Sequence, residues 1–264
     1  MSPTFAQLGV TLDQFLAFIV VLTRMSGLML AAPVFGSREV PAQIRALLAF
    51  TLSLVILPTQ WTALVTAPSS LIDLSLLIGG ELLIGYTLGL GVMTMFAGVQ
   101  IGGQIVSQTG GISAADIFNP GFDMSVPIVS QFYYMFALAV FLLIGGHQQV
   151  VAALLDTFQS LPPGAATVTD SVVDSVVRLI MQSFSLGVRT AAPATTALLL
   201  ATLVLGLVGR TLPQLNLMAL GFGINAVVMF VLLALGMSAL AWLVENELPE
   251  VMELVYQALR GMGE

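Results

Sequence analysis

Apolar runs long enough to cross a lipid bilayer are the feature of this sequence that most limits its fold. A transmembrane helix needs roughly 17–25 predominantly apolar residues. The runs of about this length, or close to it, cover residues 12–31, 42–57, 71–104, 128–144, 191–208 and 217–244. We therefore expect an all-α, multi-helix, membrane-associated protein built from long helical hairpins.

Composition excludes several functional classes. Charged residues make up 8% of the chain, against about a quarter in soluble domains. The net charge of −7 argues against nucleic acid as a partner, because nucleic-acid affinity comes from cations that neutralise phosphates. With no cysteine and a single histidine, His147, disulfides, thiolate sites and histidine metal clusters are excluded. Zinc-protease, nucleophile-elbow and P-loop motifs are also missing from the sequence, so we expect no enzyme and no cofactor.

Two of the apolar runs are longer than a bilayer requires. As single helices, residues 71–104 and 217–244 would extend about 50 Å and 42 Å, whereas the hydrocarbon core is about 30 Å thick. We expect both helices to project beyond the lipid and to pack against protein.

The Leu-Pro-Pro-Gly break at residues 161–164 divides the chain into two regions of different style. Residues 1–165 form several interrupted segments, whereas residues 166–264 are predicted to form one long helical hairpin with its tip at 209–216. Within the hairpin, Asp174 is spaced to pair with Arg178. Residues 249–260 are predicted to form a short amphipathic docking helix with Pro249 in its first turn.

Glu81 lies inside an apolar run, where an unpaired ionisable residue costs about 2.5–3.5 kcal/mol. It is either a proton or ion relay, or one half of a buried pair with an arginine. The candidate buried partners are Arg24, Arg45 and Arg189. Pairing is the favoured interpretation.

Four glycines in the same run form two pairs with a spacing of four residues, which lets helices approach closely. They are Gly85 with Gly89 and Gly98 with Gly102. This pattern predicts tight contacts between helices, but it does not identify the partner helices.

Residues 107–127 combine helix breakers with apolar side chains. The breakers are Gly110, Gly111, Pro120, Gly121 and Pro127, and the apolar residues include Ile112, Ile117, Phe118 and Phe122. Irregular backbone near a membrane is tolerated where it is buried in protein or lines a cavity. The segment is therefore either an external loop packed on the protein or a re-entrant, pore-facing loop.

Several motifs resemble one known family, in order and over nearly the whole chain. They are APVFGSREVPAQIRALL (32–48), GGELLIGYTLGLGVMTMFAGVQIGGQIVSQTGG (79–111), IFNPGFDMSVP (117–127), GGH (145–147) and GRTLPQLNLMALGFGIN (209–225). Together they resemble the FliR family of flagellar type III export-gate proteins, called SctT in injectisomes. Asn119, Gly146 and Asn225 depart from the family's usual aspartate, asparagine and basic residue, so roles that need those side chains do not carry over.

The resemblance implies a FliP-like N-terminal region, residues 1–165, followed by a FliQ-like hairpin, residues 166–264. It implies a non-catalytic subunit that joins FliP and FliQ in a helical hetero-oligomer, forming the pore for unfolded export substrates. FlhB and rod or hook-basal-body proteins would be further partners. The complex would lie in the bacterial inner membrane, in contact with lipid and partly projecting to the periplasmic side.

The resemblance also implies roles for two loops. Residues 107–127, here called the plug segment, would close the pore, with candidate plug residues Gly110, Gly111, Ile112, Ile117, Phe118, Asn119, Pro120 and Phe122. The hairpin tip, with Arg210, Pro213, Gln214 and Asn216, would face the cytoplasm, as the positive-inside rule also predicts. The alternative function is a proton-coupled secondary transporter in which Glu81 binds the proton.

Overall fold

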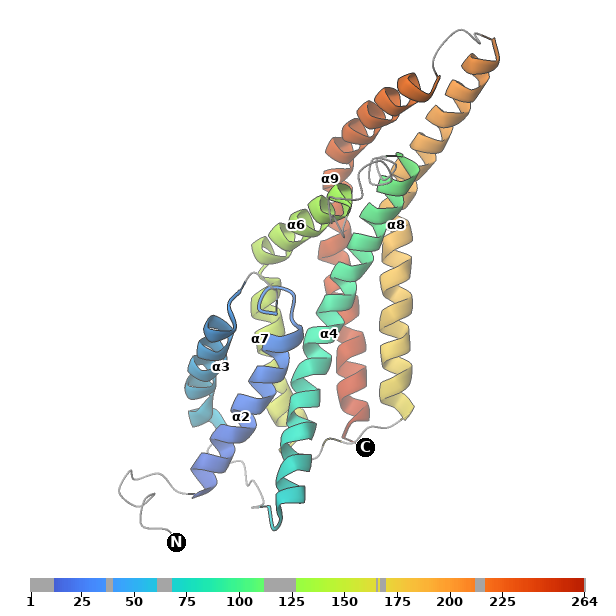
Figure 1. The fold of residues 1–264 in the computed structure, drawn as a ribbon. Coiled ribbons are helices and arrows are strands. Elements are labelled where there is room, and N and C mark those ends of the chain that lie inside the picture. The colour runs from blue at the N-terminus through green and yellow to red at the C-terminus, as the bar shows by residue number, and fades with distance from the viewer. Residues whose placement is uncertain are drawn as a thin grey trace. The chain divides into compact units, whose positions relative to one another are not determined.

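All regular structure in the described residues is helical (Figure 1). The computed structural model describes residues 12–36, 40–60, 68–111, 127–164, 166, 170–211 and 217–263. Its helices are α2 (Leu12–Ala31), α3 (Ala42–Ile56), the short 3₁₀ helix η1 (Leu57–Gln60), α4 (Leu71–Thr109), α6 (Ile128–Leu143), α7 (Gly146–Ser160), α8 (Asp170–Thr211) and α9 (Leu217–Gly261). The predicted all-α fold is confirmed.

Within these described ranges, five helical stretches are long and apolar enough to cross a membrane. They are Gln14–Ala31, Ala42–Thr59, Leu71–Thr109, Asp170–Thr211 and Gly221–Gly261. Helices α6 and α7 are separated by a short break and together would supply a sixth span. Gly145 makes this break with φ of 72°, a left-handed conformation that glycine adopts without a steric penalty.

Helices α4, α8 and α9 are longer than the sequence pattern predicts. They contain 39, 42 and 45 residues, which corresponds to about 59, 63 and 68 Å along the helix axis. Each is about twice as long as the roughly 30 Å hydrocarbon core is thick. Helix α4 continues to Thr109 and is followed by Gly111 with φ of 78°, a common way for a helix to end.

Two local predictions are wrong. Residues 249–260 are not a separate docking helix, because α9 continues through Pro249. Proline removes one backbone hydrogen bond from a helix, but good helix formers such as Glu247, Leu248 and Glu250 flank it. Asp174 and Arg178 are both exposed and form no ion pair, since such a pair in solvent contributes only a few tenths of a kcal/mol.

The chain folds into two compact units. Unit 1 contains residues 1–93, 145–179 and 250–264, and unit 2 contains 94–144 and 180–249. Helices α4, α8 and α9 contribute residues to both. This spatial division differs from the break after residue 164, and the predicted likeness of the two sequence regions to FliP and FliQ stays a prediction.

Each unit has its own buried core. In unit 1 the fully buried side chains include Leu28, Ile84, Leu88, Leu154 and Val255. In unit 2 the core is centred on Phe96, whose ring makes edge contacts with Tyr134 and Phe141 at centroid distances of 5.7 and 5.4 Å. Such aromatic pairs add stability beyond their buried area.

The paired glycines of α4 mark close helix contacts within both units. In unit 1, a Cβ placed on Gly85 would lie 1.9 Å from the backbone oxygen of Arg24 on α2. In unit 2, a Cβ on Gly98 would lie 2.5 Å from the backbone oxygen of Ser183 on α8. Gly89 and Gly102 meet the same two helices one turn further along. The predicted tight contacts are confirmed, and their partners are α2 and α8.

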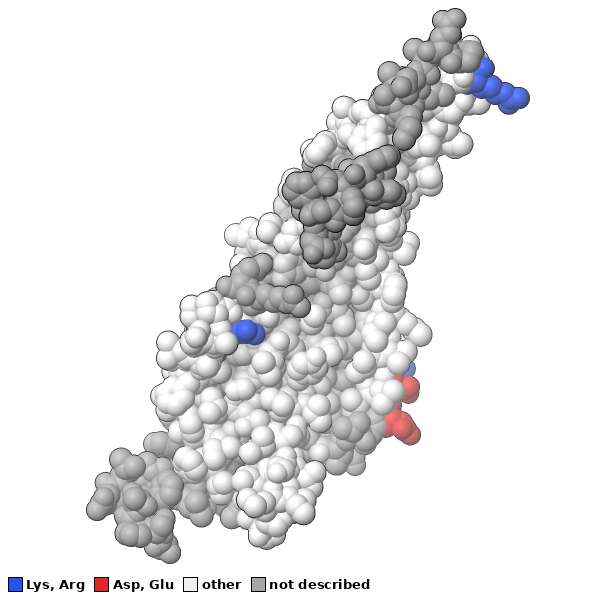
Figure 2. Space-filling view, viewed as in Figure 1, with Lys and Arg blue, Asp and Glu red and all other residues white. Residues whose placement is uncertain are grey.

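Helices α3, α8 and α9 leave most of their apolar surface uncovered. Only 17%, 17% and 22% of their apolar spanning segments are buried within the chain. Figure 2 shows a face on which few charged side chains interrupt the uncharged surface. Such extensive exposed apolar surface indicates contact with lipid or with other proteins.

Candidate functional site

A buried ion pair in unit 1 joins Arg24 on α2 to Glu81 on α4. Both side chains are 0% exposed, and Nε of Arg24 lies 2.7 Å from Oε2 of Glu81. The close approach of the two helices at Gly85, one turn beyond Glu81, brings the guanidinium within reach of the carboxylate. Of the three candidate arginines, Arg24 is thus the one that pairs with Glu81.

The remaining polar atoms of the pair bind α7 and the turn after it. Arg24 donates from Nη1 to Oγ1 of Thr157 at 3.1 Å and from Nη2 to the backbone oxygen of Leu161 at 3.2 Å. Oε1 of Glu81 accepts a hydrogen bond from the backbone N–H of Gly164 at 3.0 Å. We call these five residues the Arg24–Glu81 network. The guanidinium carbon also lies 4.2 Å from the ring centroid of Phe158, which adds a cation–π contact.

The network ties together segments that are far apart in the sequence. It connects α2, α4, α7 and the turn at 161–164 through charge-assisted hydrogen bonds, which are stronger than neutral ones. Both carboxylate oxygens of Glu81 have a donor, and the side chain has no contact with solvent. This arrangement is suited to holding unit 1 together.

Arg45 and Arg189 were predicted to be buried; this is wrong for Arg189 and holds only in part for Arg45. Arg189 on α8 is 51% exposed and pairs with Glu247 on α9, which also accepts from Nε2 of Gln182 at 2.9 Å. Arg45 on α3 is half-buried and belongs to neither of the ion pairs found among the described residues. The reason is that helices α3 and α8 are both mostly uncovered, so a long side chain can reach the surface.

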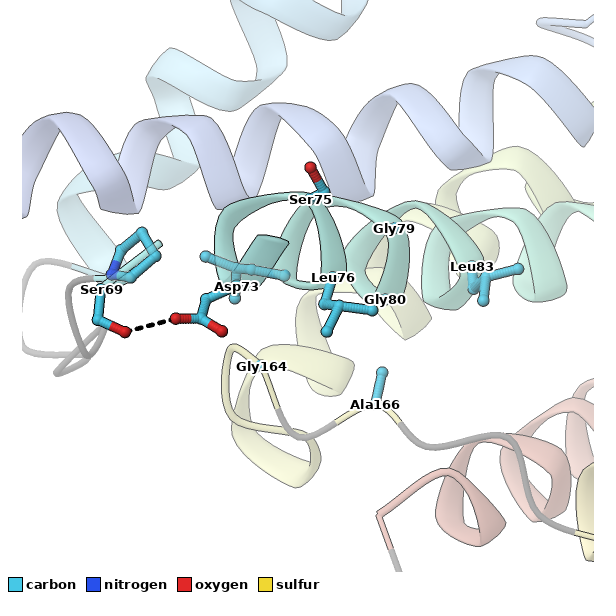
Figure 3. A pocket seen from close by; sticks show the side chains of 11 residues that line it. Ser69, Asp73, Ser75, Leu76, Gly79, Gly80, Leu83, Gly164 and Ala166 are labelled. Carbon is cyan, nitrogen blue, oxygen red and sulfur yellow. Dashed lines mark hydrogen bonds between the residues drawn. The ribbon is translucent and has the colours of Figure 1, made fainter. Parts of the chain in front are cut away.

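A cavity of about 680 Å³ lies beside the start of α4, also in unit 1 (Figure 3). Its lining comes from the first turns of α4, the preceding Pro68 and Ser69, and the segment containing Gly164 and Ala166. The hydroxyl of Ser69 donates to the Asp73 carboxylate at 2.5 Å. Asp73 is the one ionisable residue among the described residues of this lining. Its backbone N–H donates to the hydroxyl of Ser70 at 3.1 Å, so the Ser69, Ser70 and Asp73 contacts form an exposed cap at the start of α4.

Metal binding has no support in the stretches of chain that are described. No three side chains among His, Cys, Asp and Glu lie close enough there to hold an ion.

The predicted loop residues are only partly covered by the structure. Gly110 and Gly111 follow the last turn of α4, while Ile112, Ile117, Phe118, Asn119, Pro120 and Phe122 lie outside the described residues. Arg210 is exposed in the last turn of α8, while Pro213, Gln214 and Asn216 also lie outside. The plug and tip roles stay predictions.

Sequence reasoning missed the partners that complete the two polar clusters. These partners are Thr157, Phe158, Leu161 and Gly164 around Arg24 and Glu81, and Glu247 and Gln182 around Arg189. The Leu-Pro-Pro-Gly turn was one indication of such a partner. Because glycine has no side chain, its backbone N–H can approach a carboxylate closely. The sequence did not identify Thr157 and Phe158 as partners, since both residues fit an ordinary amphipathic helix.

The fold and the polar networks define a class of protein: an all-helical membrane protein with a buried ion pair among its helices. Comparison with known proteins identifies the family within this class. Residues 15–251 match the family model described as bacterial export proteins, family 1. The chain is similar to the flagellar biosynthetic protein FliR of Bacillus subtilis strain 168, with 31% identity over 95% of this chain and 96% of that protein. It is also similar to FliR of Escherichia coli K12, with 30% identity over 94% and 96% of the two chains.

The chain belongs to family 1 of the bacterial export proteins, the family of these FliR proteins. It is therefore a non-catalytic component of the flagellar export machinery. Together with its apolar helices, this membership places it in the bacterial inner membrane.

Proposed function

We propose that this chain forms, with FliP and FliQ subunits, the pore through which unfolded flagellar proteins leave the cytoplasm. The observation that carries the proposal is a family match over nearly the whole chain combined with uncovered apolar helices. Helices α8 and α9 are each about twice as long as lipid requires. They bury little of their surface within the chain, so partner subunits would cover the area that lipid does not.

The same helix lengths support a complex that projects from the inner membrane toward the periplasm. FlhB and the rod or hook-basal-body proteins would be neighbours of this complex, and the tip around Arg210 would face the cytoplasm. The FliP-like region, residues 1–165, would take the place of one FliP subunit. The FliQ-like region, residues 166–264, would take the place of one FliQ subunit.

In this proposal the plug segment closes the resting pore. Its side chains are apolar enough to exclude water, and it contains no lysine or arginine that would retain a passing chain. A transporter mechanism is less well supported. Glu81, the residue that would carry its proton, is fully buried and has a donor on each carboxylate oxygen.

Replacing the apolar plug residues tests the closed state. We expect the quadruple change of Ile112, Ile117, Phe118 and Phe122 to serine to make the inner membrane permeable to small solutes, because polar side chains no longer exclude water from the pore. Uptake of a small impermeant dye by cells measures the effect, and co-purification with FliP and FliQ measures assembly.

The matched control changes the same segment without removing apolar side chains, by replacing Ser113 and Asp116 with alanine. This variant should be as impermeable as the unaltered protein. An intact barrier in the serine variant, with normal assembly, contradicts the plug.

A further inference from the structure

A small cavity in unit 1 lies between α2 and the start of α3, with an arginine in its lining. Its volume is about 250 Å³, and its residues are Ser26, Met29 and Leu30 from α2 and Ala42, Arg45, Ala46 and Ala49 from α3. We call it the Arg45 cavity. Apart from Arg45 and the hydroxyl of Ser26, which donates to the backbone oxygen of Leu22 at 2.7 Å, the lining side chains are apolar.

Among the described residues, no anion pairs with Arg45. Its Nε is buried and has no hydrogen-bond partner, and it takes part in neither ion pair of the described residues. Helix α3 contains no acidic residue. Because a buried charged donor without an acceptor is costly, this site is suited to an oxyanion from outside the chain. The planar guanidinium matches phosphate particularly well.

The position of Arg45 on α3 places this cation at the end of an apolar span. Arg45 is the fourth residue of α3 and its only charged residue, and Pro41 before it supplies no side-chain hydrogen bond to the helix start. Arginines at the ends of membrane helices lie at the level of lipid headgroups. Basic pockets between such helices bind anionic headgroups.

The surface beside the cavity is suited to an acyl chain. Leu30 at the cavity is 58% exposed, and Leu48 and Val55, which follow Arg45 along the same side of α3, are 38% and 68% exposed. Only 17% of the apolar span that contains α3 is buried. At about 250 Å³ the cavity is smaller than the roughly 300–1,000 Å³ of pockets that enclose a whole small molecule. It would thus hold a headgroup while the tails stay outside.

We propose that the Arg45 cavity binds the phosphate of an anionic phospholipid whose acyl chain lies along the exposed face of α3. The charge and the apolar surface together favour a lipid, because a lipid supplies the missing oxyanion and also covers the α3 face. The proposal is independent of whether the chain forms a pore.

Native mass spectrometry of the full chain in mild detergent, titrated with phosphatidylglycerol, tests the headgroup. Arg45→Gln should weaken binding of one phosphatidylglycerol about fivefold, the contribution of one cation near a membrane surface. Arg45→Lys should lie between the two, since it keeps the charge without the planar fork. The matched control is Arg178→Gln, which removes an exposed arginine of unit 1 that belongs to neither ion pair of the described residues and should leave binding unchanged.

Fluorescence quenching tests the acyl chain independently. A tryptophan is placed at Leu48, in a chain whose Trp61 and Trp242 are replaced by phenylalanine, and the protein is reconstituted with brominated phosphatidylglycerol. Quenching should be stronger with Arg45 than with Arg45→Gln. Equal lipid binding by the Arg45→Gln and Arg178→Gln variants overturns the proposal. So does a loss of FliP or FliQ co-purification with unchanged lipid binding, which would favour a partner subunit over a lipid at the cavity.

Discussion

Replacing Arg24 by methionine is expected to lower the free energy of unfolding by about 3–5 kcal/mol, the usual cost of removing one partner from a buried ion pair. The change leaves the Glu81 carboxylate buried with a single donor, the N–H of Gly164. It also removes the donors to Thr157 and Leu161. The fraction of protein that stays monodisperse after heating in detergent measures the loss.

The matched control for this prediction is the double variant Arg24→Met with Glu81→Leu. Well-packed apolar residues in place of a buried pair are often neutral, so the double variant should recover most of the lost stability. A third variant, Glu81→Gln, keeps the size of the side chain and should lie between the two. If Arg24→Met were as stable as the unaltered chain, the network would not hold unit 1 together.

Introducing a methyl group at Gly85 is expected to force α2 and α4 apart. The added Cβ would lie 1.9 Å from the backbone oxygen of Arg24, and a backbone atom cannot rotate away as a side chain can. Overpacking of this kind costs about 1–3 kcal/mol and occasionally more. Gly85→Ala should therefore reduce both thermal stability and the yield of folded protein.

Gly79→Ala is the matched control, because it makes the same chemical change in the same helix. A Cβ at Gly79 meets nothing within 4 Å, and alanine is favoured over glycine inside a helix by about 1 kcal/mol. We expect this variant to be as stable as the unaltered chain or slightly more stable. Equal effects of the two alanines would mean that α2 and α4 do not pack closely at Gly85.

Much of the helical layout could be predicted from the sequence because apolar length and helix breakers are local properties. The span 12–31 and the break at Gly145 are both found in the structure. The prediction that a separate helix begins at Pro249 was wrong. The loss of one backbone hydrogen bond at the proline did not outweigh the helix formers on either side of it.

The partner of a buried charge depends on which helices pack together, and this is not a local property. The position of Glu81 in an apolar run predicted a partner of opposite charge. The candidates Arg24, Arg45 and Arg189 were equally suitable, because all three are arginines. The close contact at Gly85 decides between them, because it brings α2 rather than α3 to the carboxylate. The backbone groups of Leu161 and Gly164 could not have been chosen from side-chain chemistry at all.

The native mass of a tagged copy, purified in detergent after co-expression with FliP and FliQ, tests the central claim most directly. We predict one copy of this chain held in a large complex with several copies of both partners. A monomer or homodimer that is stable without them would contradict the account and would favour a transporter built around Glu81.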